Sequence, residues 1–183
     1  MTFVKIDYEL RPVKESDKHL ILCWRNQPHV RDFMYTDHEI TVEEHDAWFE
    51  KALEDPDACY LILEQLGAPV AFTNFTSIDR KNNKCIWGFY LTSSHPQQGT
   101  GSVMAWFLLD HCFRTMGLRK LYCESFAFNC KACSLYLKFG FTQEAHLRQH
   151  ILKKGRYEDV LGFGLLSEEW SQLRDNLAKS LFK

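Results

Sequence analysis

The segment Gln98-Gly99-Thr100-Gly101-Ser102 constrains the fold more than any other part of the sequence. It follows an apolar run at residues 85–91 that is typical of a strand. It precedes a long apolar run at residues 102–116 that is typical of a helix. Glycines let the backbone approach a ligand closely, and the first N–H groups and the dipole of a helix favour an anion. The segment therefore predicts an anion site, although an ordinary turn with a helix cap explains it equally well.

Segments with strand and helix periodicity alternate along the rest of the chain. Strands are predicted at residues 7–13, 59–64, 70–78, 85–91, 120–128, 141–152 and 157–166. Helices are predicted at residues 15–26, 42–55, 102–116, 132–139 and 170–181, and residues 29–39 are expected to form a loop or short helical turn. This order predicts an α/β fold, with one domain over residues 1–183 and a central mixed, twisted sheet of about seven strands flanked by helices. Residues 167–183 are expected to form a C-terminal helical extension.

Composition excludes several classes of partner. The 183 residues suffice for one domain with a full core, and the net charge of −2 provides no overall basic field for nucleic acid. No run approaches the roughly 20 apolar residues of a membrane span, and no signal peptide is evident. The seven cysteines are odd in number and scattered, which indicates free thiols. We therefore expect a cytoplasmic protein with no nucleic-acid or membrane partner.

Other ligand motifs do not fit. The loop lacks the Gly-Lys-Ser/Thr of a P-loop and the third glycine of a dinucleotide fingerprint. Cys130 and Cys133 form a single C-x-x-C pair without the second pair or spaced histidines of a zinc site. His146 and His150 have a metal-binding spacing only on a helix, and a strand is predicted there. No metal is therefore expected.

A second motif supplies specificity. The sequence Asn129-Cys130-Lys131-Ala132-Cys133-Ser134-Leu135-Tyr136-Leu137-Lys138-Phe139-Gly140-Phe141 contains every fixed position of the pattern Asn-x-x-Ala-x-x-Leu-Tyr-x-x-x-Gly-Phe. It resembles the second signature block of the GNAT superfamily of acetyltransferases. The Gln98 loop is similar to the family's Gln/Arg-x-x-Gly-x-Gly/Ala block through Gly101 and departs from it at Val103. The resemblance implies a GNAT domain that transfers acetyl directly from acetyl-CoA to an amine in a ternary complex.

The resemblance also implies roles for individual residues. The pyrophosphate of acetyl-CoA would lie on the loop formed by Gln98, Gly99, Thr100, Gly101 and Ser102. Backbone groups of Leu91 and the side chain of Asn129 would hold the pantetheine arm from two sides. Tyr136 would protonate the departing thiolate as the general acid, the alternative being a core aromatic residue.

Glu124 is the candidate base. It lies between Cys123 and Ser125 in an otherwise apolar run, where a lone carboxylate costs free energy unless it is paired or functional. Burial would raise its pKa toward the working range of a base acting through water. A structural ion pair with an arginine or lysine explains its position equally well.

The acceptor is suggested by phrases spread over nearly the whole chain, from Trp24-Arg25-Asn26 and Glu44-His45-Asp46-Ala47-Trp48 to Gly155-Arg156-Tyr157-Glu158-Asp159. They resemble the N-acetyltransferases of pseudaminic acid synthesis, which acetylate the 4-amino group of a UDP-linked 4-amino-4,6-dideoxy sugar. Arg25 could bind the diphosphate, and Trp48 or Tyr35 could stack on the uracil. By resemblance, Met34 and Tyr90 would line the sugar pocket.

Alternatives remain for these residues and for the function. Trp48 is also compatible with a helix-face core position, and Arg25 with a surface or interface salt bridge. The alternative acceptors are a protein N-terminus, of the ribosomal-protein type, or a small amine. A more distant alternative is a non-catalytic acyl-CoA-binding sensor. A homodimer is also considered.

Overall fold

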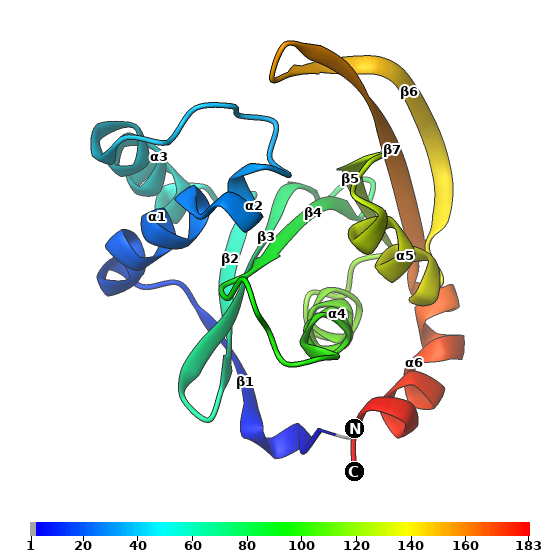
Figure 1. The fold of residues 1–183 in the computed structure, drawn as a ribbon. Coiled ribbons are helices and arrows are strands. Elements are labelled where there is room, and N and C mark those ends of the chain that lie inside the picture. The colour runs from blue at the N-terminus through cyan, green and yellow to red at the C-terminus, as the bar shows by residue number, and fades with distance from the viewer. Residues whose placement is uncertain (1–2) are drawn as a thin grey trace.

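One seven-stranded sheet organises the protein, whose computed structural model describes residues 3–183 (Figure 1). The strands lie in the order β1-β2-β3-β4-β5-β7-β6, and only the β4–β5 pair is parallel. Their bounds are Tyr8–Pro12 (β1), Cys59–Gln65 (β2), Ala68–Asp79 (β3), Lys84–Leu91 (β4), Lys120–Phe126 (β5), Thr142–Lys153 (β6) and Arg156–Leu166 (β7). The predicted mixed seven-stranded α/β fold is confirmed.

The helices form where the hydrophobic periodicity predicts them, with one addition. Their bounds are Lys18–Asn26 (α1), Pro28–Arg31 (α2), Val42–Glu54 (α3), Thr100–Asp110 (α4), Cys130–Lys138 (α5) and Ser167–Leu181 (α6). The short α2 begins with Pro28 in its first turn and occupies part of the segment expected to be a loop or helical turn. A π-helical turn, His111–Thr115, continues α4 to the end of the predicted helix.

Strand β2 shows how the helices divide between the two faces of the sheet. Leu61 and Leu63 belong to the large core that includes α4, whereas Ile62 packs in a smaller core with Ile21 of α1 and Phe49 of α3. Alternate residues of a strand point to opposite faces. Helices α1 and α3 therefore cover one face and α4 covers the other, as Figure 1 shows.

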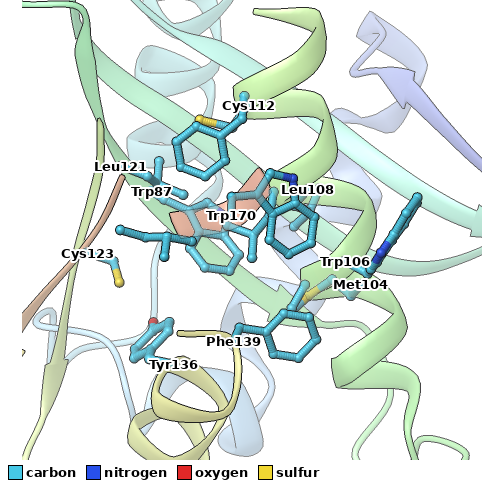
Figure 2. Packing of buried hydrophobic residues seen from close by; sticks show 14 of the residues in the cluster. Trp87, Met104, Trp106, Leu108, Cys112, Leu121, Cys123, Tyr136, Phe139 and Trp170 are labelled. Carbon is cyan, nitrogen blue, oxygen red and sulfur yellow. The ribbon is translucent and has the colours of Figure 1, made fainter. Parts of the chain in front are cut away.

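The large core is rich in aromatic rings. Figure 2 shows Trp87 of β4 between Cys112, which follows α4, and Tyr136 of α5, in one cluster with Phe139 and with Trp170 of α6. Helix α6 is tied to α4, since Arg174 forms an ion pair with Asp110 at 2.5 Å. The predicted C-terminal helix is thus docked on its own domain. No helix within residues 3–183 is both long and apolar enough to cross a bilayer.

Strands β4 and β5 separate along their length, and this separation creates the site. They pair only at their beginnings, from Lys84 with Lys120 to Ile86 with Tyr122. Beyond this point β4 keeps its pairing with β3 as far as Leu91, and β5 keeps its pairing with β7 as far as Phe126. Within the described chain, the second half of β4 thus has no strand on its β5 side.

Candidate active site

A cavity of about 740 Å³ opens where β4 and β5 separate. One wall is formed by the second halves of these strands and by α5. The other is formed by α1, by α3 and by residues 33–40 between α2 and α3. A cavity of this size matches a small-molecule site. It brings together eight of the residues selected from the sequence, namely Arg25, Met34, Tyr35, Trp48, Tyr90, Glu124, Asn129 and Tyr136.

Tyr136 lies in the cavity wall on the buried face of α5. It is 5% exposed, and its ring packs on Phe163 at 5.1 Å and edge-on to Trp87 at 5.9 Å. Figure 2 shows its oxygen on the side where Cys123 lies. Burial, followed by the charge and the hydrogen bond of the neighbouring Cys123, raises the pKa of the Tyr136 hydroxyl well above its usual value. The hydroxyl is therefore protonated at neutral pH and able to donate a proton.

Glu124 lies in the same cavity, but the expected burial of its carboxylate is wrong. The residue is exposed, while Cys123 and Ser125 on either side of it are buried. Strand alternation explains this, because Glu124 points to the opposite face from its neighbours. Among residues 3–183, Glu124 does not form the arginine or lysine ion pair considered for it either. Its partners are two phenols, with Tyr35 donating to Oε2 at 2.6 Å and Tyr122 donating to Oε1 at 3.0 Å.

Gly99 and Gly101 shape the start of α4 in different ways. Gly99 is the N-cap residue with a φ of 97°, in the left-handed region, and a Cβ there would lie 2.9 Å from the ring of Phe3. At Gly101 the space is open, since a Cβ would meet only Leu91 Cδ1, at 4.0 Å. The glycine at position 101 thus leaves open space beside the beginning of the helix.

The remaining loop residues divide into an inward and an outward group. The side chain of Thr100 is buried, and its amide and hydroxyl both donate to the carbonyl of Gln97, so its hydroxyl is turned away from a ligand. Gln98 is exposed. Ser102 is 9% exposed and accepts a hydrogen bond from Lys138 Nζ at 2.9 Å.

Lys138 is a residue that the sequence motif did not identify. It occupies a variable position of the Asn129–Phe141 block, and only the packing of α5 beside α4 brings its ammonium to Ser102. Its ammonium lies at the beginning of α4, where it adds a full positive charge to the partial positive charge of that helix dipole. The combination suits a pyrophosphate, so the residues present fit acetyl-CoA.

Asn129 and Leu91 stand on either side of the gap between the strands. Asn129 is the N-cap of α5, and its Oδ1 accepts the amide of Ala132 at 3.3 Å, which leaves the amide nitrogen of its side chain for a ligand. Leu91 ends β4, and its carbonyl lies 3.2 Å from His29 Nε2 of α2. The exposed edge of β4 provides backbone groups that an amide-containing ligand can use.

Arg25 of α1 and Tyr90 of β4 both line the cavity. Nη1 of Arg25 and the hydroxyl of Tyr90 are buried without a hydrogen-bond partner in the described structure. Burial lowers the pKa of Arg25 and raises that of Tyr90. The described residues place no carboxylate in an ion pair with Arg25, so the surface salt bridge considered for it is not formed within this chain, and the interface salt bridge stays a prediction. Unpaired buried polar groups are costly and indicate a ligand.

The three remaining acceptor residues lie in different parts of the wall. Trp48 is 37% exposed, which excludes the core position considered for it, and it packs edge-on to Tyr60 at 5.6 Å. Tyr35 is bound to Glu124, next to the reaction centre. Met34 lines the cavity from the loop, and its carbonyl accepts Lys153 Nζ at 2.5 Å. Lys153 is a second residue that the sequence did not identify.

Glu44 and His45, two other ionisable side chains of the cavity, make hydrogen bonds within the domain. Glu44 accepts the amide of Thr41 at 2.9 Å and contacts His38 at 3.0 Å, so it completes the predicted cap of α3. His45 is buried, contacts the carbonyl of Lys18 at 2.8 Å, and has a pKa lowered by burial. No group of His, Cys, Asp or Glu side chains within residues 3–183 is arranged to hold a metal.

Comparisons with known proteins agree with this geometry. The family described as "Acetyltransferase (GNAT) domain" matches residues 8–142. The prophage-derived N-acetyltransferase YokL of Bacillus subtilis, itself uncharacterized, is 30% identical over 67% of this chain and 70% of its own. The acetyltransferase PseH of Campylobacter jejuni is 28% identical over 71% of this chain and 80% of its own.

A solved structure shows the same fold. The spermidine N-acetyltransferase of Vibrio cholerae, in complex with CoA and spermine, has a TM-score of 0.84 at 20% identity and covers 91% of this chain and 99% of its own. At this identity the likeness concerns the fold alone. The family match spans most of the cavity wall, from β1 to the beginning of β6. The chain therefore belongs to the GNAT acetyltransferase family and is an N-acetyltransferase that uses acetyl-CoA.

Proposed function

We propose that the protein transfers acetyl from acetyl-CoA to the 4-amino group of a UDP-linked 4-amino-4,6-dideoxy sugar. The transfer is direct, within a ternary complex in one cavity. The similarity to PseH over 71% of the chain supports the proposal, as does the resemblance of the acceptor residues to the N-acetyltransferases of pseudaminic acid synthesis. A cytoplasmic location belongs to it, because all seven cysteines are free thiols. A homodimer stays a prediction.

The unpaired Arg25 guanidinium is the observation that carries this proposal. Its Nη1 atom and the Tyr90 hydroxyl lie in the cavity wall without partners among the described residues. A diphosphate offers the anionic oxygens that a guanidinium binds in two-pronged fashion. Trp48, exposed at the rim, offers an aromatic surface for the uracil.

The same charges argue against a polyamine. Spermidine is a cation and needs carboxylates that are free to pair with it. Of the two carboxylates in the cavity wall, Glu44 accepts the amide of Thr41 and contacts His38 at the start of α3, and we assign Glu124 to the proton transfer and not to binding. Arg25 is the charged side chain of the cavity wall that has no partner among the described residues, and its positive charge disfavours an ammonium beside it.

The cofactor side of the site positions the donor. Acetyl-CoA, when bound, supplies a thioester that an amine can attack. Its pyrophosphate would bind at the beginning of α4, in the open space beside Gly101 and next to the ammonium of Lys138. The free edge of β4 and the side-chain amide of Asn129 would hold the pantetheine arm, which directs the reacting group toward Tyr136.

Tyr136 and Glu124 then divide the proton transfers. The amine must lose a proton, and Glu124, which faces the cavity solvent, accepts it through water while Tyr35 and Tyr122 hold the carboxylate in place. The leaving thiolate needs a proton, and the protonated Tyr136 hydroxyl donates it. The two groups lie on adjacent elements, β5 and α5, on one side of the gap.

Transfer and binding assays test the acceptor. We expect thiol release with a UDP-4-amino-4,6-dideoxy sugar and none above background with spermidine or an N-terminal peptide. UDP alone should raise the melting temperature, because a ligand that binds only the native state stabilises it by about 2.7 kcal/mol at a hundred times its Kd.

The variant Arg25→Met should lose the UDP effect and keep the acetyl-CoA effect. Its matched control is Arg80→Met, because Arg80 is an exposed arginine in the turn just after β3. Acetylation of spermidine with no response to UDP would overturn the nucleotide-sugar acceptor while leaving the acetyltransferase itself intact.

A further inference from the structure

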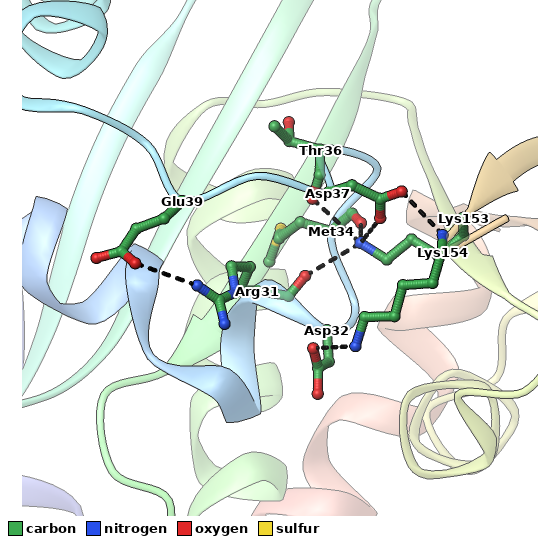
Figure 3. A network of polar contacts seen from close by, with 8 residues as sticks. All are labelled: Arg31, Asp32, Met34, Thr36, Asp37, Glu39, Lys153 and Lys154. Atoms are coloured by element: carbon green, nitrogen blue, oxygen red, sulfur yellow. Dashed lines mark hydrogen bonds and ion pairs between the residues drawn. The ribbon is translucent and has the colours of Figure 1, made fainter.

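Lys153, at the tip of the β6–β7 hairpin, is buried although it is charged. It is 4% exposed, and its ammonium contacts the loop after α2 (Figure 3). Nζ donates to three backbone carbonyls, those of Arg31 at 3.3 Å, Met34 at 2.5 Å and Thr36 at 3.1 Å. It also forms an ion pair with Asp37 at 3.0 Å. Lysine is almost never fully buried unless it is paired.

The loop that Lys153 holds is the acceptor wall of the cavity. We call residues 31–37 the acceptor segment, since Phe33, Met34 and Tyr35 on it line the cavity. The ammonium of Lys153 satisfies three backbone carbonyls of this segment, which therefore need no hydrogen bond from water or from a neighbouring strand. The segment follows α2, whose His29 lies 3.2 Å from the carbonyl of Leu91 at the cofactor edge.

The acceptor segment also reaches the reaction centre. Tyr35 donates to Glu124 at 2.6 Å, and its ring packs edge-on to Phe126 at 5.3 Å. The backbone on either side of Tyr35 is held by Lys153 through Met34 and Thr36. The placement of the Tyr35 hydroxyl therefore depends on an ammonium that is more than a hundred residues away in sequence.

We propose that Lys153 is a positioning residue for the acceptor half of the reaction. It holds the acceptor segment closed over the cavity and keeps Tyr35 on Glu124, without touching either substrate. Its loss should therefore weaken acceptor binding and base catalysis, and leave acetyl-CoA binding intact. The inference applies to whichever amine the protein acetylates, because it concerns the loop and not the ligand.

The test is Lys153→Met, which keeps most of the aliphatic length and removes the ammonium. Its matched control is Lys81→Met, because Lys81 is an exposed lysine in the turn between β3 and β4. Hydrogen exchange of residues 31–37 and the Kd of acetyl-CoA would be measured on both. The KM of the acceptor would be measured with the UDP-4-amino sugar or, if that is not acetylated, with spermidine.

We expect Lys153→Met to speed exchange in the acceptor segment and raise the acceptor KM by about tenfold or more, as the loss of one or two buried hydrogen bonds implies. The Kd of acetyl-CoA should change by less than about twofold. Lys153→Arg should restore part of the loss, and Lys81→Met should stay near wild type.

Unchanged exchange in Lys153→Met, or an equal loss of acceptor and acetyl-CoA binding, would overturn the inference. If Lys153→Met does not fold, Asp37→Asn removes the charge of the ion-pair partner while leaving the three carbonyl contacts. It should raise exchange in the same residues by a smaller factor. No rise in that variant would equally overturn the inference.

Discussion

The cofactor side and the acceptor side of the cavity are built in different ways. The cofactor side consists of two continuous stretches, the loop before α4 and the block from Asn129 through α5. The groups proposed to bind acetyl-CoA there are backbone atoms, cap residues and the side chain of Lys138, and most of their positions follow from local conformation. The acceptor side is assembled from α1, α3, the acceptor segment and the distant hairpin tip. Its geometry depends on contacts between side chains far apart in the chain.

This difference predicts which side of the cavity tolerates amino-acid substitutions better. Backbone-based binding of a pyrophosphate requires a glycine and a helix beginning, and little else. The acceptor side depends on single charges, since Arg25 is unpaired in the cavity wall and Lys153 holds the acceptor segment. The donor site is thus expected to tolerate substitutions that the acceptor site does not.

The largest effect is expected where the two sides meet, at Tyr136. In Tyr136→Phe the ring keeps its packing on Trp87 and Phe163, and only the hydroxyl is lost. Because proton transfer to the thiolate is then unassisted, kcat should fall by about 10²–10⁴-fold. The Kd of acetyl-CoA should change by less than about threefold. Steady-state thiol release and calorimetric binding measure the two quantities.

The matched control for this prediction is Cys123→Ala. It removes the sulfur partner of the Tyr136 hydroxyl and leaves the hydroxyl itself. A kcat close to wild type in Cys123→Ala, with a large loss in Tyr136→Phe, separates proton donation from packing. An unchanged kcat in Tyr136→Phe would remove the general-acid role.

The second prediction concerns the cofactor side alone. Lys138 adds its charge where α4 begins, at 2.9 Å from Ser102. Lys138→Met should raise the Kd of acetyl-CoA by about tenfold, which corresponds to one charge-assisted contact with a phosphate. The difference from wild type should shrink at high salt, because ionic screening weakens the contact. Acceptor KM should hardly change.

Lys131→Met is the control for Lys138→Met, because Lys131 is an exposed lysine in the first turn of the same helix. It should bind acetyl-CoA like wild type. Equal effects of the two substitutions would mean that only the net charge of α5 matters. A Lys138→Met protein with normal affinity would assign the pyrophosphate to the backbone of the loop alone.

The predictability of the site from sequence follows the same division. The loop, Asn129 and Tyr136 were predictable because their motifs are contiguous and their elements have clear periodicity. The exposure of Glu124 could also have been inferred, since a strand residue between two buried ones faces the other way. The mostly apolar run around Glu124 indicated burial instead.

The burial of Lys153 at the hairpin tip and the lack of a partner for Arg25 could not be predicted from the sequence. A lysine next to a turn is ordinarily exposed, and nothing near Lys153 indicates that residues 31–37 will cover it. The unpaired state of Arg25 likewise emerges only when every other charge of the cavity has found its partner. Both depend on long-range packing, which a local pattern does not encode.

The smallest effect is expected at the anchor of the acceptor side, Asp17. This carboxylate, just before α1, accepts Arg11 Nη1 at 2.7 Å and the amide of Lys14 at 2.8 Å, and thereby ties the helix that carries Arg25 to β1. The hydrogen bond from Arg11, with the amide and nearby charges, lowers the pKa of Asp17. Asp17→Asn should lower the free energy of unfolding by about 1–2 kcal/mol near neutral pH.

The sign of its pH dependence follows from that lowered pKa. A carboxylate with a lower pKa in the folded state stabilises the fold above the unfolded value of about 3.9 and loses this contribution as the pH falls through the folded value. Urea unfolding should therefore show a constant gap between wild type and Asp17→Asn near neutral pH, closing in acid. The control Asp57→Asn, in an exposed pair with Arg80, should cost less than about 0.5 kcal/mol. A gap that stays constant into acid would mean that the substitution acts through packing, and that α1 is held on the acceptor side without the charge of Asp17.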